Sequence, residues 1–184
     1  MDHAVVLGAG GAARAVVSSL LEFCDRITLI NRTRATAEAL VKDLQQSEVL
    51  LRVQAKEIIT EVGFQTIEKK EIRLNPFQIV EWEDRASSLE DATLLVNTTS
   101  LGMKGQPPLE IDLARLPVTA LVTDIVYAPL ITPLLAQARA RGNPMVDGLG
   151  MLIYQAQLAF KQFFGVLPEV TPGLRTLVEA RCSS

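Results

Sequence analysis

The pattern of apolar and polar residues divides most of the 184-residue chain into short apolar runs and longer amphipathic runs. Short runs rich in Val, Ile and Leu predict strands, and apolar residues at helical spacing predict helices. Strands that alternate with helices over short connections are typical of a parallel sheet covered on both faces. The expected strands are 5–7, 26–31, 77–82, 94–97, 121–126 and 145–148, and the expected helices are 12–23, 33–44, 132–142, 150–164 and one beginning at 171–172.

Residues with strong positional preferences mark several helix ends. Thr33 precedes the second helix and is expected to act as its N-cap. Thr132 followed by Pro133 marks the start of a later helix, and Gly142 marks its end. The pattern is least legible over residues 45–90, where the remaining hints are a helical stripe of Ile58, Ile59 and Val62 and a mixed-charge stretch, 68–71, typical of a solvated face or a hairpin.

A glycine-rich stretch after the first strand carries the strongest functional signal. Gly8, Gly10 and Ala13 form the pattern G-x-G-x-x-A between an apolar strand and an Ala-rich helix. Gly8 allows a sharp turn, Gly10 leaves room for a pyrophosphate, and Ala13 keeps the helix close to the sheet. Free N–H groups and the helix dipole favour phosphate at the first turn. The pattern predicts a dinucleotide site on a Rossmann-like fold, a doubly wound parallel α/β sheet of about six strands in three layers; the alternative is a purely structural turn.

The residues after the second strand indicate which dinucleotide binds. A carboxylate here would favour NAD, because it hydrogen-bonds the ribose 2′-hydroxyl and repels a 2′-phosphate. The chain instead has Asn31, Arg32, Thr33 and Arg34. Guanidinium groups match phosphate oxygens and stack on adenine, so this segment favours NADP. The alternative is that both arginines are solvated at the start of a helix, and Arg14 either assists them or simply covers the surface.

Composition and charge argue against several classes of function, among them nucleic-acid binding, membrane binding and metal-dependent chemistry. The chain is 48% hydrophobic and 21% charged with a net charge of -3, which gives no reason to expect nucleic acid or an anionic membrane as a partner. No apolar run approaches the ~20 residues of a membrane span. Residues 1–3 carry no basic region ahead of an apolar stretch, so we expect no signal peptide. Cys24 and Cys182 lack metal-ligand spacing, so we expect no metal site and two reduced thiols in a cytoplasmic protein. The single histidine, His3, is expected to be solvated, which disfavours a Ser-His or Cys-His hydrolase.

Four segments together resemble the cofactor domain of shikimate dehydrogenases. They are GAGGAARA followed by NRT, then VNTTSLGM at 96–103, DIVYAPLITPLL at 124–135 and DGLGMLIYQAQLAF at 147–160. They occur in the family's order over most of residues 4–165, apart from the middle segment. The resemblance implies an oxidoreductase of the shikimate pathway, which reduces 3-dehydroshikimate to shikimate with NADPH in aromatic amino acid biosynthesis.

The resemblance also implies roles for individual residues. Gln155 is expected to reach a substrate hydroxyl, and Tyr127 to lie at the edge of the reaction site. The expected cofactor contacts are Gly8, Ala9, Gly10, Gly11 and Ala12 at the pyrophosphate; Asn31, Arg32, Thr33 and Arg34 at the adenosine phosphate; Asn97, Thr98, Thr99 and Met103 beside the cofactor; and Ile125, Tyr127, Gly148 and Met151 at the nicotinamide. Each group has a structural alternative, since Asn97 and the threonines can cap their loop and Tyr127 and Met151 can belong to packing.

Members of this family carry an N-terminal domain ahead of the glycine turn, with most substrate contacts and a Lys–Asp catalytic pair. Because the turn begins at Gly8, we expect residues 1–184 to form a single NADP-binding domain without that pair. We assign no catalytic residue and expect NADPH binding with little turnover alone. An exposed apolar surface, and self-association through it, are expected where that domain would pack. The alternatives are a stand-alone NADP-binding sensor or scaffold and a quinate dehydrogenase.

Overall fold

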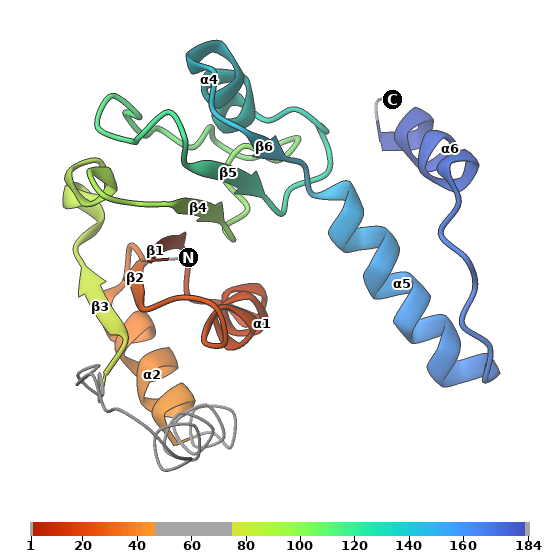
Figure 1. The fold of residues 1–184 in the computed structure, drawn as a ribbon, viewed down its shortest axis with the longest axis horizontal. Helices are drawn as coiled ribbons and strands as arrows, with labels where there is room; N and C mark the ends of the chain where they lie inside the picture. Colours follow the sequence, from red (N-terminus) through yellow and green to blue (C-terminus); the bar gives the residue numbers. More distant parts are fainter. Residues whose placement is uncertain (1, 47–74, 183–184) are drawn as a thin grey trace, which may run out of the picture.

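Six parallel strands form one sheet in the computed structural model, which describes residues 2–46 and 75–182 (Figure 1). The strands are β1 (His3–Leu7), β2 (Arg26–Ile30), β3 (Phe77–Val80), β4 (Leu94–Asn97), β5 (Leu121–Asp124) and β6 (Met145–Val146). Their order across the sheet is β3-β2-β1-β4-β5-β6, and every neighbouring pair is parallel. This order confirms the expected doubly wound sheet of the Rossmann type.

Helices and connecting segments cover both faces of the sheet. The helices are α1 (Gly11–Leu20), α2 (Arg34–Gln45), α4 (Pro133–Arg141), α5 (Leu149–Phe164) and α6 (Pro172–Cys182), with short 3-10 turns η1 (Trp82–Asp84) and η2 (Ser87–Leu89). One apolar core packs α1 and α2 against the sheet, and a second core packs α4 and the 89–120 region against the other face. The central strand β1 is buried along its whole length, which explains its unbroken apolar composition after His3.

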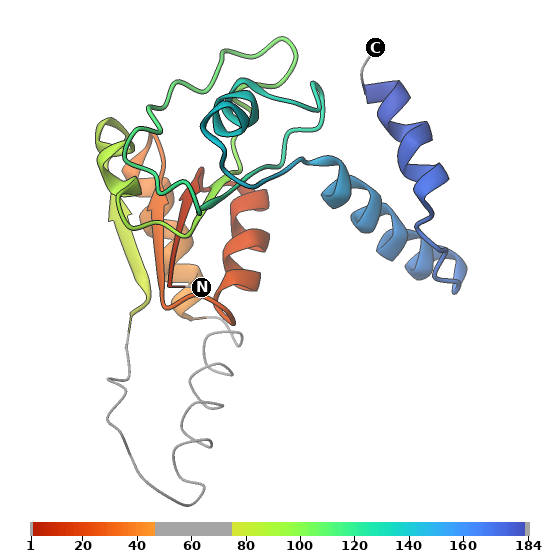
Figure 2. The same ribbon diagram turned by 45° about the horizontal axis from the view of Figure 1, so that its top comes forward.

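The last two helices extend away from this sandwich. Figure 2 shows α5 leaving the sheet after β6 and α6 running back beside it. Only Leu149 and Ile153 of α5 are buried, and α6 buries none of its described residues. The α5–α6 pair therefore presents apolar side chains to solvent rather than to the sheet.

Several local predictions are confirmed by hydrogen bonds at helix ends. The Thr132 hydroxyl accepts a bond from the Leu135 N–H at 3.3 Å, and Pro133 occupies the first turn of α4. Gly142 ends α4 with a left-handed φ of 87°. The Thr171 hydroxyl likewise accepts from Leu174 N at 3.2 Å at the start of α6. These signals are local in sequence, which is why the pattern alone identified them.

Other local predictions need correction. Thr33 precedes α2 in an extended conformation, but its side chain makes no capping hydrogen bond, and the Asn31 amide donates to its carbonyl instead at 2.9 Å. The strand expected over 121–126 ends at Asp124, because the Asp124 carboxylate accepts from Val126 N at 3.0 Å and turns the chain. The strand expected over 145–148 is two residues long. The expected stripe at Ile58, Ile59 and Val62 and the stretch 68–71 lie outside the described residues.

The expectation of a solvated His3 is wrong. His3 is only 3% exposed, because β1 begins at this residue and lies between β2 and β4. Its Nδ1 lies 2.8 Å from the Asp91 carboxylate, and its Nε2 lies 2.8 Å from the Thr28 hydroxyl. Burial, followed by the nearby Arg26 charge, lowers the pKa of His3 despite the opposing effect of Asp91. His3 is a buried hydrogen-bonding residue of the sheet.

Candidate dinucleotide-binding site

The turn after β1 is fixed by Gly8. Gly8 has a φ of +107°, and its N–H donates to the Ile30 carbonyl of β2 at 2.8 Å. A Cβ at this position would lie 2.6 Å from the Thr98 hydroxyl. Both the backbone conformation and the close approach therefore require glycine, as the sequence predicted for the turn.

Gly10 and Gly11 differ from Gly8 because space is open above them. Gly10 precedes α1 in an extended conformation. Among residues 2–46 and 75–182, no atom outside the turn and the local helix backbone lies within 4 Å of a Cβ at either residue. The first N–H groups of a helix have no acceptor within the helix, and the first turn of α1 carries no acidic side chain. Ala13 is fully buried, so α1 packs closely on the sheet as expected. Open space over unpaired N–H donors fits an anionic group such as a diphosphate.

The strand order reverses between β1 and β4, where the glycine turn meets the loop after β4. Thr98 donates to the Leu7 carbonyl through both its N–H, at 2.8 Å, and its hydroxyl, at 2.6 Å. Asn97 Oδ1 accepts from the N–H of Thr99 at 3.0 Å and from its hydroxyl at 2.7 Å. These side chains shape the loop, and they hold it directly beside the glycine turn. Ligands of open α/β sheets bind at such a reversal point.

Asp124 is a component of this region that the sequence patterns did not single out. It is fully buried at the end of β5 and accepts from Asn97 Nδ2 at 3.0 Å and from the Thr132 hydroxyl at 2.7 Å. Burial raises its pKa, while the donated hydrogen bonds act in the opposite direction. Asp124 joins the ends of β4 and β5 to the start of α4. Its signal in the sequence is an acidic residue at the end of an apolar strand, where burial requires hydrogen-bonding partners.

A second close approach positions the start of α5. A Cβ on Gly148 would lie 2.4 Å from the Ile125 carbonyl oxygen and 2.6 Å from that of Val126. Glycine therefore lets α5 begin directly against the segment after β5. Met151 and Gln155 follow at helical spacing on the same side of α5, and both are exposed.

The loops after β4 and β5 lie side by side. The Lys104 N–H donates to the Ala128 carbonyl at 2.8 Å, which links the segment containing Met103 to the segment containing Tyr127. Met103 and Tyr127 are each 39% exposed. The structure thus brings the expected residues of the loops after β1, β4 and β5 to the carboxyl edge of the sheet, with Gly148 packed against the last of these loops.

The arginines after β2 differ in their surroundings. Arg34 pairs with Glu38 at 2.8 Å and with Glu81, and both carboxylates raise the pKa of Arg34. Arg32 is exposed and makes no side-chain hydrogen bond or ion pair within residues 2–46 and 75–182. Arg14 pairs with Asp43 at 2.6 Å, so its role is accounted for by the α1–α2 contact. Arg32 is therefore the guanidinium of this segment that is available to an anion.

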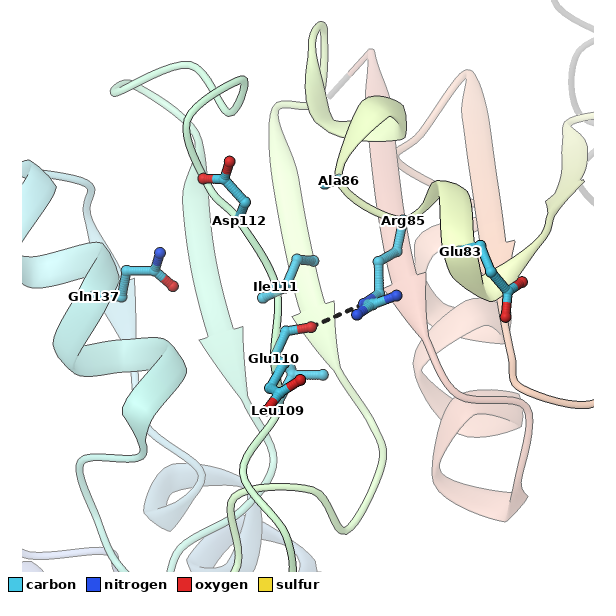
Figure 3. A pocket seen from close by; sticks show the side chains of 8 residues that line it. All are labelled: Glu83, Arg85, Ala86, Leu109, Glu110, Ile111, Asp112 and Gln137. Carbon is cyan, nitrogen blue, oxygen red and sulfur yellow. Dashed lines mark hydrogen bonds between the residues drawn. The ribbon is translucent and has the colours of Figure 1, made fainter.

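A pocket on the α4 face is separate from these loops. Figure 3 shows it between the segment after β3, the 109–112 segment and α4, and Arg85 donates across it to the Glu110 carbonyl at 2.8 Å. The Arg85 guanidinium also lies over the Trp82 ring, 4.9 Å from its centroid. No residue expected in the dinucleotide site lines this pocket. Arg85 is thus the side chain that links the segment after β3 to the 109–112 segment.

The described residues contain neither a metal-binding cluster nor a membrane-spanning helix. Among residues 2–46 and 75–182, no group of three or more His, Cys, Asp or Glu side chains is arranged to hold a metal ion. Within the same part of the chain, every helix is too short or too polar to cross a membrane.

Sequence comparisons identify relatives for this site and fold. Residues 1–95 match the family described as Shikimate / quinate 5-dehydrogenase, and residues 148–177 match the Shikimate 5′-dehydrogenase C-terminal domain. The "Shikimate dehydrogenase (NADP(+))" of Dinoroseobacter shibae is 52% identical over 172 residues, which cover 93% of this chain and 51% of that relative. The chain spans about half the length of the curated relatives it matches.

Solved structures share the fold. Quinate dehydrogenase from Corynebacterium glutamicum in complex with NAD has a TM-score of 0.75 at 27% identity, covering 97% of this chain and 55% of that one. Shikimate 5-dehydrogenase from Thermus thermophilus in complex with NADP(H) and shikimate has a TM-score of 0.68 at 29% identity, covering 97% of this chain and 54% of that one. The family match covers more than half of the chain, and the structure has the expected sheet, the glycine turn and the loops at the point where the strand order reverses. This chain therefore belongs to the shikimate / quinate 5-dehydrogenase family.

Proposed function

We propose that the chain is the NADP-binding domain of a shikimate dehydrogenase, which reduces 3-dehydroshikimate to shikimate with NADPH in aromatic amino acid biosynthesis. The observation that carries this proposal is the open, N–H-lined turn at Gly10 and Gly11, with the available guanidinium of Arg32 at the end of the neighbouring strand β2. The proposal is also supported by a relative that is 52% identical to this chain and is named "Shikimate dehydrogenase (NADP(+))".

The residues present fit a phosphorylated dinucleotide. The turn from Gly8 to Ala12 would hold the diphosphate through backbone N–H groups, since no side chain of the described residues lies within 4 Å of a Cβ at Gly10 or Gly11. Arg32, with Asn31 and Thr33 beside it, would hold the adenosine phosphate through charge-assisted hydrogen bonds. The loop from Asn97 to Met103 would then lie along the cofactor toward the nicotinamide.

The other end of the site would orient the nicotinamide and the substrate. A bound nicotinamide supplies the hydride chemistry of the reaction, and the protein supplies orientation and exclusion of water. Ile125, Gly148 and Met151 would border the ring, with Gly148 keeping α5 against the segment after β5. Gln155 would hydrogen-bond a substrate hydroxyl from the exposed side of α5, and Tyr127 would close the edge of the site.

The proposal includes a second, substrate-binding domain in the complete enzyme. Relatives are about twice the matched length, and α5 and α6 expose apolar side chains that such a domain would cover. The proton for the new hydroxyl group would come from that domain, so residues 1–184 alone would turn over little substrate. Self-association through the same apolar surface is part of the proposal, as is a cytoplasmic location in line with the free thiols of Cys24 and Cys182.

Quinate is the second candidate substrate. The structure of a quinate dehydrogenase resembles this chain with a TM-score of 0.75, and the matching family description names both substrates. Gln155 and Tyr127 suit any polyhydroxylated ring, so they do not separate shikimate from quinate. The 52% identity to an enzyme named for shikimate is the reason that shikimate is proposed first.

Calorimetric titration tests the cofactor assignment. NADPH and NADH are titrated into the wild-type chain, into Arg32→Ala, and into Arg139→Ala, an exposed arginine of α4 that serves as the matched control. We expect NADPH to bind more tightly than NADH, and Arg32→Ala to weaken NADPH binding by about tenfold to hundredfold while NADH binding is retained. No binding of either coenzyme, or equal losses for both in Arg32→Ala, would contradict the proposal.

A further inference from the structure

Glu81 lies beside the segment that would read the adenosine ribose. β2 and β3 run parallel, and Ile30 is opposite Val80 at their last register position. Glu81 follows Val80 as Asn31 follows Ile30, so both emerge at the same edge of the sheet. This places an acidic side chain next to the Asn31–Arg34 segment from a strand that the dinucleotide fingerprint does not include.

Glu81 engages one of the two arginines directly. The Arg34 guanidinium donates through Nη1 to Glu81 and through Nε to Glu38, the latter at 2.8 Å. One guanidinium thus lies between two carboxylates, and this cluster carries a net charge of -1 from two acids and one base. Arg32, two residues earlier, has no such partner within the described part of the chain. The two cations of the segment are therefore not equivalent toward an anion.

We infer that Glu81 weakens the preference of this site for NADP over NAD, because it holds the Arg34 guanidinium away from the ribose 2′-phosphate and presents a like charge to that phosphate. This inference rests on the proposed function. A phosphate must compete with Glu81 for Arg34, and it meets the Glu81 carboxylate itself. NAD carries a hydroxyl at this position, so neither effect applies to it. Glu81 thereby limits the discrimination in favour of NADP that two free arginines would give.

The effect should be moderate in size. The side chains of Arg34 and Glu81 are each 49% exposed, so solvent screens their charges, and exposed ion pairs are weak. Replacing Glu81 with glutamine leaves Glu38 to hold Arg34 Nε, removes the like charge, and turns the ion pair at Nη1 into a weaker neutral hydrogen bond that a phosphate can displace. We expect the ratio of NADP⁺ affinity to NAD⁺ affinity to rise about three- to tenfold.

The test is calorimetry of NADP⁺ and NAD⁺ on the full chain with Glu81→Gln. Glu83→Gln is the matched control, because it makes the same charge change two residues away at an exposed side chain. The expected result is a raised NADP⁺/NAD⁺ affinity ratio in Glu81→Gln, no change of ratio in Glu83→Gln, and loss of the gain in Glu81→Gln/Arg34→Ala.

Three other results would each overturn part or all of this reasoning. If wild type binds NADP⁺ and Glu81→Gln leaves the ratio unchanged or lowers it, the inference about Glu81 is wrong and the proposed function stands. If wild type binds neither coenzyme, both the proposed function and the inference that rests on it are overturned. A gain that persists without Arg34 would also overturn the inference, since the released guanidinium would not be its source.

Discussion

His3 illustrates how the neighbours of a single residue decide its chemistry. Its place near the start of the chain suggested a solvated imidazole, yet the parallel register of β1 with β2 and β4 buries it between Thr28 and Asp91. The sequence could not reveal these partners, because they are 25 and 88 residues away. Gly8 is the opposite case, since the turn it forms follows from local conformation and was predicted from spacing alone.

The burial of His3 makes a prediction for the pH dependence of stability. Its folded-state pKa is lower than the ordinary value of 6.5, so the unfolded chain takes up the proton first. The contribution of neutral His3 is fully present above about pH 6.5 and is lost as the pH falls through the lowered pKa. In urea titrations, His3→Gln should lose about 1–3 kcal/mol of unfolding free energy at pH 7.5, and the deficit should shrink at pH 5.5. A deficit that grows on acidification would show that His3 is not held neutral.

At the scale of elements, hydrogen bonds between strand ends determine the loops that carry the site. The cap of α4 at Thr132 was predictable from a Thr-Pro pair, but its second role, donating to Asp124, was not. Asp124 meets Asn97 from a different strand, 27 residues away, so only the strand order brings them together. The close approach of Gly148 to Ile125 is also tertiary, and a glycine in the sequence alone does not reveal it.

Replacing Asp124 with asparagine tests this junction. Asn97 and Val126 donate to one carboxylate oxygen of Asp124, and the Thr132 hydroxyl donates to the other. An asparagine amide has only one acceptor oxygen, so at this position one of these two sets of donors loses its charged acceptor. The neutral amide avoids the cost of burying a charged carboxylate, but the loss of an accepted hydrogen bond should cost more. We therefore expect Asp124→Asn to lower the unfolding free energy by about 1–3 kcal/mol in urea titrations at pH 7. Asp25→Asn, at an exposed position, is the control. Wild-type stability in Asp124→Asn would mean that the junction does not depend on the carboxylate.

At the scale of the whole molecule, the sequence predicted the sandwich and the two C-terminal helices, but not the course that these helices take. Alternating strands and helices define a doubly wound sheet, and the observed order follows from it. The course of α5 and α6 does not follow from periodicity, because neither helix buries an apolar stripe against the sheet. The Arg175 guanidinium of α6 instead reaches Asp147 after β6, at 2.7 Å. The predicted exposed apolar surface is present on these two helices, where Phe163 is 83% and Leu177 is 63% exposed.

Self-association through the α5–α6 surface remains a prediction. Large exposed apolar patches mark interaction surfaces, so the isolated chain should form dimers or larger species at micromolar concentration in sedimentation velocity. Phe163→Lys/Leu177→Lys should shift it toward monomer without changing NADPH affinity. Val118→Lys places the same charge at an exposed apolar residue in a loop and should leave association unchanged. A monomeric wild type, or association that survives the double substitution, would exclude this surface as the contact.

The open turn over Gly10 should accommodate a diphosphate, and replacing Gly10 with alanine tests this. In the described part of the chain, no atom beyond the neighbours of Gly10 lies within 4 Å of a Cβ there, and the Gly10 backbone is extended. The unfolding free energy of Gly10→Ala should therefore lie within about 0.5 kcal/mol of the wild-type value. Gly8→Ala, where the Cβ would lie 2.6 Å from the Thr98 hydroxyl, is the contrasting variant and should be strongly destabilised. In calorimetry, Gly10→Ala should bind NADPH about tenfold or more weakly, because the new methyl group occupies the space of the pyrophosphate. A folded Gly10→Ala chain that binds NADPH as tightly as wild type would contradict the account.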